Sequence, residues 1–78
     1  MTNKRVVENW RNGREGDAMN LHTDGKSLYS YALEIGFTDL KSGEKIVKNY
    51  MSGGKFISMT TSHHVSIAKI FADKVVNP

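Results

Sequence analysis

Five small polar or titratable residues stand in a row at positions 60–64, where a strand-like run gives way to a helix-like run. The first turn of a helix leaves four backbone N–H groups without helical partners, and these groups and the helix dipole attract anions. Capping of the helix by one hydroxyl group, with the other side chains solvated, is the simpler competing interpretation. The candidate anion-binding or nucleic-acid-binding residues at this junction are Thr60, Thr61, Ser62, His63 and His64.

A second candidate site lies near the N-terminus, where Trp10 is followed by Arg11 and Arg14. Basic side chains hold phosphates, and an aromatic ring between them offers a surface on which a base stacks. The lysines of the later strands have a different explanation, because exposed lysines on a strand prevent edge-to-edge aggregation. We therefore predict that Trp10, Arg11 and Arg14 contact nucleic acid.

Catalytic and metal-binding chemistry find little support in the residue pattern. The chain has three histidines and no cysteine, and neighbouring histidines on a helix point too far apart to share one zinc ion easily. No nucleophile elbow, phosphate-binding glycine loop or paired-carboxylate motif is present. We predict no catalytic residue, no metal site and no cofactor, and hence no enzyme.

Length and charge limit the class of protein. The 78 residues are enough for one small domain, 1–78, in which residues 1–16 are either a flexible accessory segment or a short element packed onto the sheet. Eleven basic and eight acidic residues give a net charge of +3, which mildly favours anionic partners. No apolar run approaches the ~20 residues of a membrane span. We expect a cytoplasmic protein with no membrane contact.

The clearest strand pattern covers residues 27–37. Tyr29, Tyr31, Leu33, Ile35 and Phe37 share one parity, and successive side chains of a strand point to opposite faces. The pattern predicts one strand whose aromatic face is the core.

A weaker strand precedes it, and the register between the two depends on the loop that joins them. A two-residue Asp-Gly loop would place Met19 and Leu21 on the face opposite Tyr29. A three-residue loop at 23–25, with Gly25 left-handed, would pair Met19 with Tyr29 and place all the large apolar groups together. Since one buried face makes a register slip costly, we predict the three-residue loop.

The rest of the chain predicts two more strands and a helix. Residues 44–51 and 55–59 read as strands, and from Val65 to Val76 apolar residues recur at three- and four-residue spacing, as in an amphipathic helix. Thr61 or Ser62 is the expected N-cap. The predicted fold is α+β: an antiparallel three- to four-stranded β-meander with one C-terminal α-helix packed across one sheet face.

Two segments, TDGKSLYSY at 23–31 and SMTTSHHV at 58–65, resemble parts of small uncharacterised proteins of bacteriophages. The resemblance implies a phage origin, and with it the cytoplasm of a host cell. It implies no activity and no functional residues. The order of strands and helix is also similar to that of double-stranded-RNA-binding domains, although the lysine cluster that opens their last helix is missing here.

These observations lead to two functional hypotheses. The first is a small non-catalytic binding module that contacts nucleic acid through phosphates. The alternative is a phage-encoded inhibitor or regulator that binds a host protein, as a monomer or as a homodimer, for which a thin core and an exposed apolar surface would speak.

Overall fold

The fold is α+β. The computed structural model describes residues 1–50 and 58–78, and within them it has two helices and a six-stranded sheet in the order β1-β2-β3-β4-β5-β6. All neighbouring strands are antiparallel except β5 and β6, which are parallel. Neither described helix combines the length and apolarity that a bilayer crossing requires. The elements are α1 (Asn3–Arg11), β1 (Gly16–Asp17), β2 (Leu21–Thr23), β3 (Leu28–Ser30), β4 (Leu33–Thr38), β5 (Lys45–Lys48), α2 (Met59–Phe71) and β6 (Lys74–Val76).

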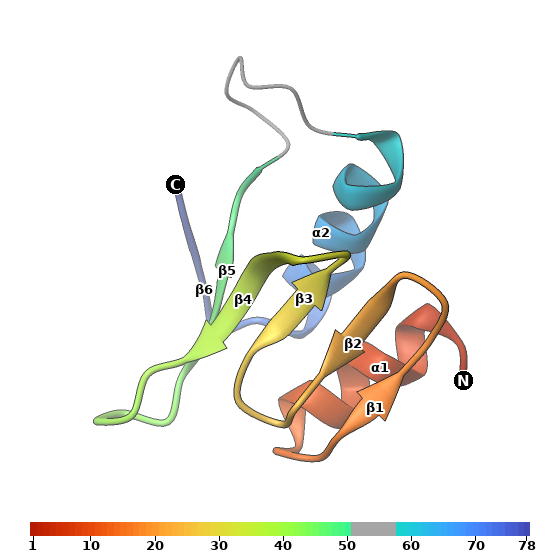
Figure 1. Ribbon diagram of the computed structural model, residues 1–78. Helices are drawn as coiled ribbons and strands as arrows, with labels where there is room; N and C mark the ends of the chain where they lie inside the picture. The colour runs from red at the N-terminus through yellow and green to blue at the C-terminus, as the bar shows by residue number, and fades with distance from the viewer. Residues whose placement is uncertain (51–57) are drawn as a thin grey trace.

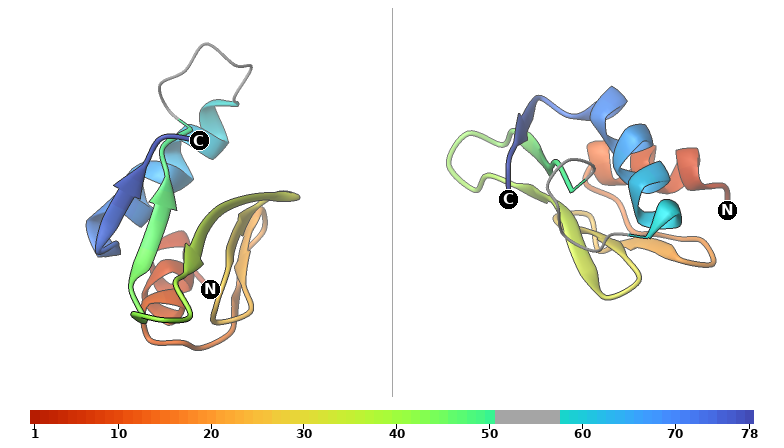
Figure 2. Two further views of the ribbon diagram at one scale, coloured as in Figure 1. Left: turned by 90° about the vertical axis from the view of Figure 1, so that its left-hand side faces the viewer. Right: turned by 90° about the horizontal axis from the view of Figure 1, so that it is seen from above.

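Both helices pack on one face of the sheet, which we call the inner face (Figure 1). Figure 2 shows in two further views that α1 and α2 lie to the same side of β2, β3 and β4. The opposite, outer face is covered by no described element. The core between the helices and the sheet consists of Val6, Val7, Trp10, Leu21, Leu28, Ile35, Val47, Val65 and Ala68.

Helix α1 resolves the ambiguity of the N-terminal segment. The Thr2 hydroxyl caps it by accepting a hydrogen bond from the Arg5 N–H at 3.2 Å. Val6, Val7 and Trp10 form one apolar stripe and are fully buried. Residues 3–11 are therefore an integral part of the core and not an accessory segment.

The expected long strand at 27–37 is instead a hairpin. Ser30 pairs with Leu33, so residues 31 and 32 form a tight turn between β3 and β4, with Tyr31 at a φ of 56°. No glycine or proline marks this turn. In one continuous strand, Leu28 and Ser30 would lie on the face opposite Leu33. Because of the turn, they share the inner face with Leu33.

A β-bulge in β4 changes the parity a second time. Tyr29 pairs with Glu34 and Leu28 with Gly36, so that Ile35 is an extra residue. Ile35 and Gly36 are both buried. The prediction of one aromatic core face is therefore wrong: Leu33 and Ile35 point inward, whereas Tyr29 and Phe37 lie on the outer face and Tyr31 is 48% exposed in the turn.

The loop between β2 and β3 has four residues, not three. Thr23 pairs with Leu28, and the Asp24 carboxylate accepts hydrogen bonds from the backbone N–H groups of Lys26 and Ser27. Gly25 has a φ of +96°, as expected for a left-handed position. The observed register buries Leu21. It leaves Met19 95% exposed, so the expected place of Met19 in the core is also wrong.

Strand β5 lies within the predicted strand 44–51, but the C-terminal prediction needs correction. Helix α2 begins at Met59, with Ser58 as its N-cap in place of Thr61 or Ser62. It ends at Phe71, and Val75 and Val76 belong to β6. Of the predicted strand 55–59, residues 55–57 lie outside the described residues and Met59 is helical. The α+β class is confirmed, whereas the expected meander with a single helix has fewer strands and helices than the structure.

Candidate ligand-binding face

Trp10 is a core residue. Its side chain is fully buried, and its indole N–H donates a hydrogen bond to the carbonyl of Lys26 at 3.0 Å. A Cβ atom at Gly36 would lie 3.0 Å from the indole ring, so the sheet backbone approaches the ring closely. The Lys45 ammonium lies 5.6 Å from the ring centroid. The ring has no exposed surface on which a base could stack, so we assign Trp10 no contact with nucleic acid.

The two arginines of the same candidate site lie apart from the ring. The Arg11 guanidinium donates a 2.6 Å hydrogen bond to the Asp73 carboxylate, which also accepts the backbone N–H of Lys45 at 2.8 Å. The hydrogen bond from Arg11 holds the pKa of Asp73 below its usual value, and the Lys45 N–H acts in the same direction. Arg14 is exposed, and its side chain makes no ion pair with a described residue. The structure does not bring these three residues together.

The 60–64 junction is divided between the core and the surface. Thr61 and His64 are buried and meet Ser30, whose hydroxyl oxygen lies 3.0 Å from Thr61 Oγ1 and 2.7 Å from His64 Nδ1. Thr60 and His63 are exposed, and Ser62 is half-buried. The junction therefore offers only part of the predicted set of donors to a ligand.

The Ser30–His64 contact has the residue types of a nucleophile and its base. Burial is the main reason that the pKa of His64 lies below its ordinary value, and the neighbouring charge of His63 adds to the effect. The imidazole is therefore neutral at pH 7, as a base would be. However, Ser30 is fully buried and its hydroxyl also bonds Thr61. A nucleophile must reach its substrate, so this cluster is better explained as a satisfied polar network between β3 and α2.

The outer face carries a row of aromatic and charged groups that the sequence analysis missed. The rings of His22 and Tyr29 stack with centroids 5.1 Å apart and planes 18° apart. The Lys48 ammonium lies 5.6 Å from the Phe37 ring centroid and bonds the Glu34 carboxylate at 2.8 Å. His22 is exposed, and Tyr29 and Phe37 are half-buried. The row is visible only once the register is known, because neither the bulge nor the two-residue turn leaves a signature in the sequence.

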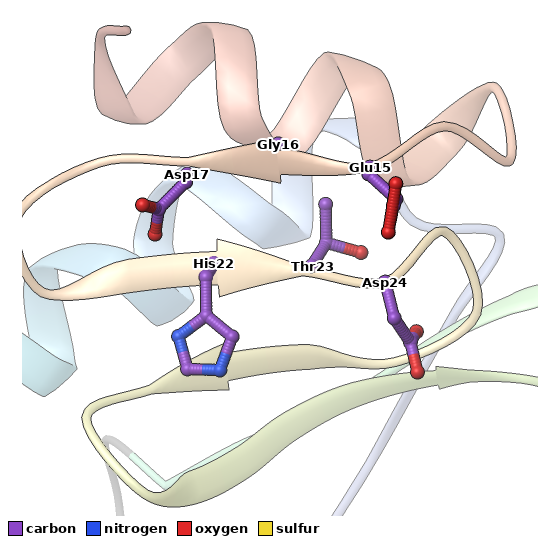
Figure 3. A pocket seen from close by; sticks show the side chains of 6 residues that line it. All are labelled: Glu15, Gly16, Asp17, His22, Thr23 and Asp24. Atoms are coloured by element: carbon purple, nitrogen blue, oxygen red, sulfur yellow. The ribbon is translucent and has the colours of Figure 1, made fainter.

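An acidic hollow borders the β1 end of this face (Figure 3). It has a volume of about 480 Å³ and is lined by Glu15, Gly16, Asp17, His22, Thr23 and Asp24. Asp17 pairs with His22 across β1 and β2, and Figure 3 shows both side chains beside each other at the hollow. Backbone N–H groups, first that of Ser27 and then that of Lys26, lower the pKa of Asp24. The hollow therefore carries negative charge at neutral pH.

Within residues 1–50 and 58–78, no three histidine, aspartate or glutamate side chains are placed to hold an ion. The outer face and the hollow thus present rings, carboxylates and ammonium groups.

Some of the acidic side chains gather at the hollow, whereas the basic ones are spread over the surface. Three of the eight acidic residues line the hollow, so the remaining surface has more basic than acidic side chains. Three ion pairs join described residues: Arg11–Asp73, Lys48–Glu34 and Lys74–Glu44. Seven basic side chains form no ion pair within the described part of the chain, namely Lys4, Arg5, Arg14, Lys26, Lys41, Lys45 and Lys69, and Lys45 among them is buried.

Comparison with known proteins found no family model, no curated protein and no solved structure that matches the chain. Its function is therefore inferred from the chemistry of its own surface.

Proposed function

We propose that the chain is a small non-catalytic binding module that contacts nucleic acid, with phosphate groups supplying most of the attraction. One observation carries the proposal: the outer face of the sheet, which no described element covers, presents the half-buried rings of Tyr29 and Phe37, with the Lys48 ammonium beside Phe37. Aromatic side chains with neighbouring cations suit a polyanion that also carries flat bases. The burial of the Ser30–His64 contact supports the absence of catalysis.

The distribution of charge supports this proposal and indicates which part of the outer face the nucleic acid contacts. Lys74 pairs with Ile46 across β5 and β6, so it lies on the outer face together with Lys48. The acidic hollow lies at the opposite end of the sheet, at β1 and β2. A phosphate backbone is repelled from the acidic β1 end, and at the β5–β6 end it meets Lys48 and Lys74, each of which also has a glutamate partner. The nucleic acid therefore binds over β3 to β6.

Salt dependence tests the proposal directly. Binding of generic DNA and RNA, measured by fluorescence anisotropy, should weaken steeply as salt rises, with a log–log slope of about −0.7 per phosphate contacted on a single strand. The variant Lys48→Gln/Lys74→Gln should reduce that slope by the contribution of about two phosphates.

The matched control is Lys4→Gln/Lys69→Gln, which removes the same charge from the two helices. It should leave the slope nearly unchanged, because these lysines lie on elements that cover the inner face. Absence of binding at low salt removes the proposal. Equal effects of the two double variants would show that net charge alone acts and that the outer face is not the site.

A second candidate function is the binding of a host protein, with or without homodimer formation. The specific observation in its favour is the exposure of large apolar side chains on α2, where Met59 is 90% and Ile70 is 77% exposed. Apolar contacts of this kind are nearly insensitive to moderate salt. A pull-down from bacterial lysate with and without nuclease separates the two: a protein that is captured equally well after nuclease treatment favours this candidate.

A further inference from the structure

We infer that the outer face binds single-stranded nucleic acid by stacking bases on Tyr29 and Phe37, with the backbone on the side of β5 and β6. The inference rests on the proposed function and names its ligand class and its contact residues. It is carried by the position of the two rings, by their partial exposure and by the charge on either side of them.

The two rings form a platform on neighbouring strands. Tyr29 is in β3 and Phe37 in β4, and Phe37 follows Gly36, which pairs with Leu28 beside Tyr29. Both residues lie on the outer face and both are half-buried, with the His22 ring against one side of Tyr29 and the Lys48 ammonium over Phe37, so a base would stack on the side of each ring away from that neighbour. Rings in this arrangement accept successive bases of one strand, and every base has a π-face to offer. In a duplex those faces are already stacked on neighbouring bases, so a platform selects unpaired nucleotides.

The platform is held in place before any ligand arrives. The His22 ring stacks on Tyr29 from the neighbouring strand, and Lys48 holds its position at Phe37 through its 2.8 Å bond to Glu34. Glu34 is itself held by a 2.8 Å hydrogen bond from the Ser27 hydroxyl. A pre-ordered surface loses less conformational freedom on binding, so more of the stacking energy is available for affinity.

The charges beside the platform set the course of the backbone. Lys48 and Lys74 lie beyond Phe37, and although each has a glutamate neighbour, Lys74 is 61% exposed and its distance to Glu44 is 3.5 Å. On the other side, beyond Tyr29 and His22, lies the acidic hollow. The binding site thus ends at Tyr29 and is open toward β6, which accommodates two stacked bases and their phosphates.

The test compares a fluorescent oligo-dT and oligo-U with a DNA hairpin duplex of equal charge, at one low salt concentration. The single strands should bind more tightly than the duplex. Tyr29→Leu and Phe37→Leu should each weaken single-strand binding roughly tenfold, since they keep apolar bulk and remove the ring. Tyr31→Leu is the matched control, because Tyr31 is a partly exposed tyrosine that lies in the turn and outside the paired strands. It should bind like the unmodified protein.

The outcomes separate this inference from the proposed function. Salt-dependent binding that survives Tyr29→Leu and Phe37→Leu overturns the stacking inference and leaves the proposed function standing. Tighter binding of the duplex overturns the single-strand assignment in the same way. If the protein binds no nucleic acid at all, both the stacking inference and the proposed function are wrong. If a variant fails to fold, the binding measurement on that variant is replaced by another experiment. The unmodified protein is then photocrosslinked to oligonucleotides that contain 4-thiouridine. Crosslinks within 28–38 support the inference, and crosslinks confined to α1 or α2 contradict it.

Discussion

Single residues in this small domain connect elements that are far apart in the sequence. The hydroxyl of Ser30 in β3 meets His64 and Thr61 in α2, and all three side chains are buried. A buried polar group costs stability unless it is hydrogen-bonded, and one partner left alone costs about 1–3 kcal/mol. These contacts therefore specify how α2 sits on the sheet, in addition to the apolar packing of Val65 and Ala68.

The burial of His64 predicts a loss of stability on mild acidification. Its pKa is lowered in the folded protein, chiefly by burial, from an ordinary value of 6.5. As the pH falls below 6.5, the unfolded chain binds a proton that the folded chain does not, so the free energy of unfolding decreases. The slope for one proton is at most about 1.4 kcal/mol per pH unit. Urea denaturation between pH 7.5 and 5 measures it.

Two variants establish that His64 is the source. His64→Gln removes the titrating group, so its unfolding free energy should be nearly independent of pH in this range. His63→Gln serves as the control, because His63 is exposed and the acid-side loss should persist without it. A flat profile for the unmodified protein, or an unchanged slope in His64→Gln, would contradict the prediction.

At the scale of elements, the start of α2 is decided by one hydroxyl. The Ser58 side chain accepts the N–H of Thr61 at 3.1 Å, and its hydroxyl also bonds Thr61 Oγ1 at 3.0 Å. A helix whose first turn is capped in this way frays less. Because Thr61 also reaches Ser30, the cap extends the buried network to the first turn of the helix.

Ser58→Ala should therefore destabilise the domain by about 0.5–2 kcal/mol, the usual cost of a lost N-cap. Chemical denaturation followed by circular dichroism measures the change. Ser62→Ala is the matched control, since Ser62 is one of the two N-caps expected from the sequence, with Thr61, but lies inside the observed helix. The prediction fails if Ser62→Ala costs as much as Ser58→Ala.

Some features of the elements follow from the sequence pattern, and others do not. The strand at β5, the left-handed Gly25 and the inward position of Leu33 and Ile35 were predictable from alternation and turn chemistry. The division of 27–37 into two strands was not, because Tyr31 takes a positive φ that tyrosine rarely adopts. The end of α2 at Phe71 was hidden as well, since Val75 and Val76 continue the helical spacing into β6.

At the scale of the whole molecule, Asp73 connects the C-terminal segment to two elements that lie far from it in the sequence. It follows α2, precedes β6, and accepts hydrogen bonds from Arg11 at the end of α1 and from the backbone of Lys45 in β5. One carboxylate thus holds the last strand against the rest of the sheet. Since its pKa is lowered in the folded protein, it stabilises the fold above the unfolded value near 3.8, and this contribution is lost as the pH falls toward the folded value.

Asp73→Asn should loosen β6 more than the remainder of the sheet. Amide hydrogen exchange should become faster at Val75 and Val76, while protection at Leu21 and Leu28 changes less. Lys74→Gln is the control, because its ion pair with Glu44 is exposed and such pairs contribute little. Uniformly faster exchange throughout the sheet, or no change at β6, would show that Asp73 does not act locally at this strand.

The residues predicted as a binding site do not gather at one place in the structure. Composition predicts an affinity for anions, which stays a prediction, but Trp10 belongs to the core, Arg11 is bound to Asp73, and Thr61 and His64 are buried. The rings that line the outer face were expected inside. A turn without glycine and one bulge are enough to reverse them, because each shift of one residue transfers the following side chains to the opposite face.

What the sequence by itself determined is local: the α+β class, the amphipathic character of its segments and the glycine-bearing turns, all of which depend on neighbours within a few residues. The tertiary structure decided which face is buried, which hydroxyl groups are partnered, and which rings remain accessible. These outcomes depend on contacts such as Ser30 with His64 and Arg11 with Asp73, which join residues 34 and 62 positions apart. Periodicity carries no information about partners at such separations, because only the packed sheet and helices bring them together.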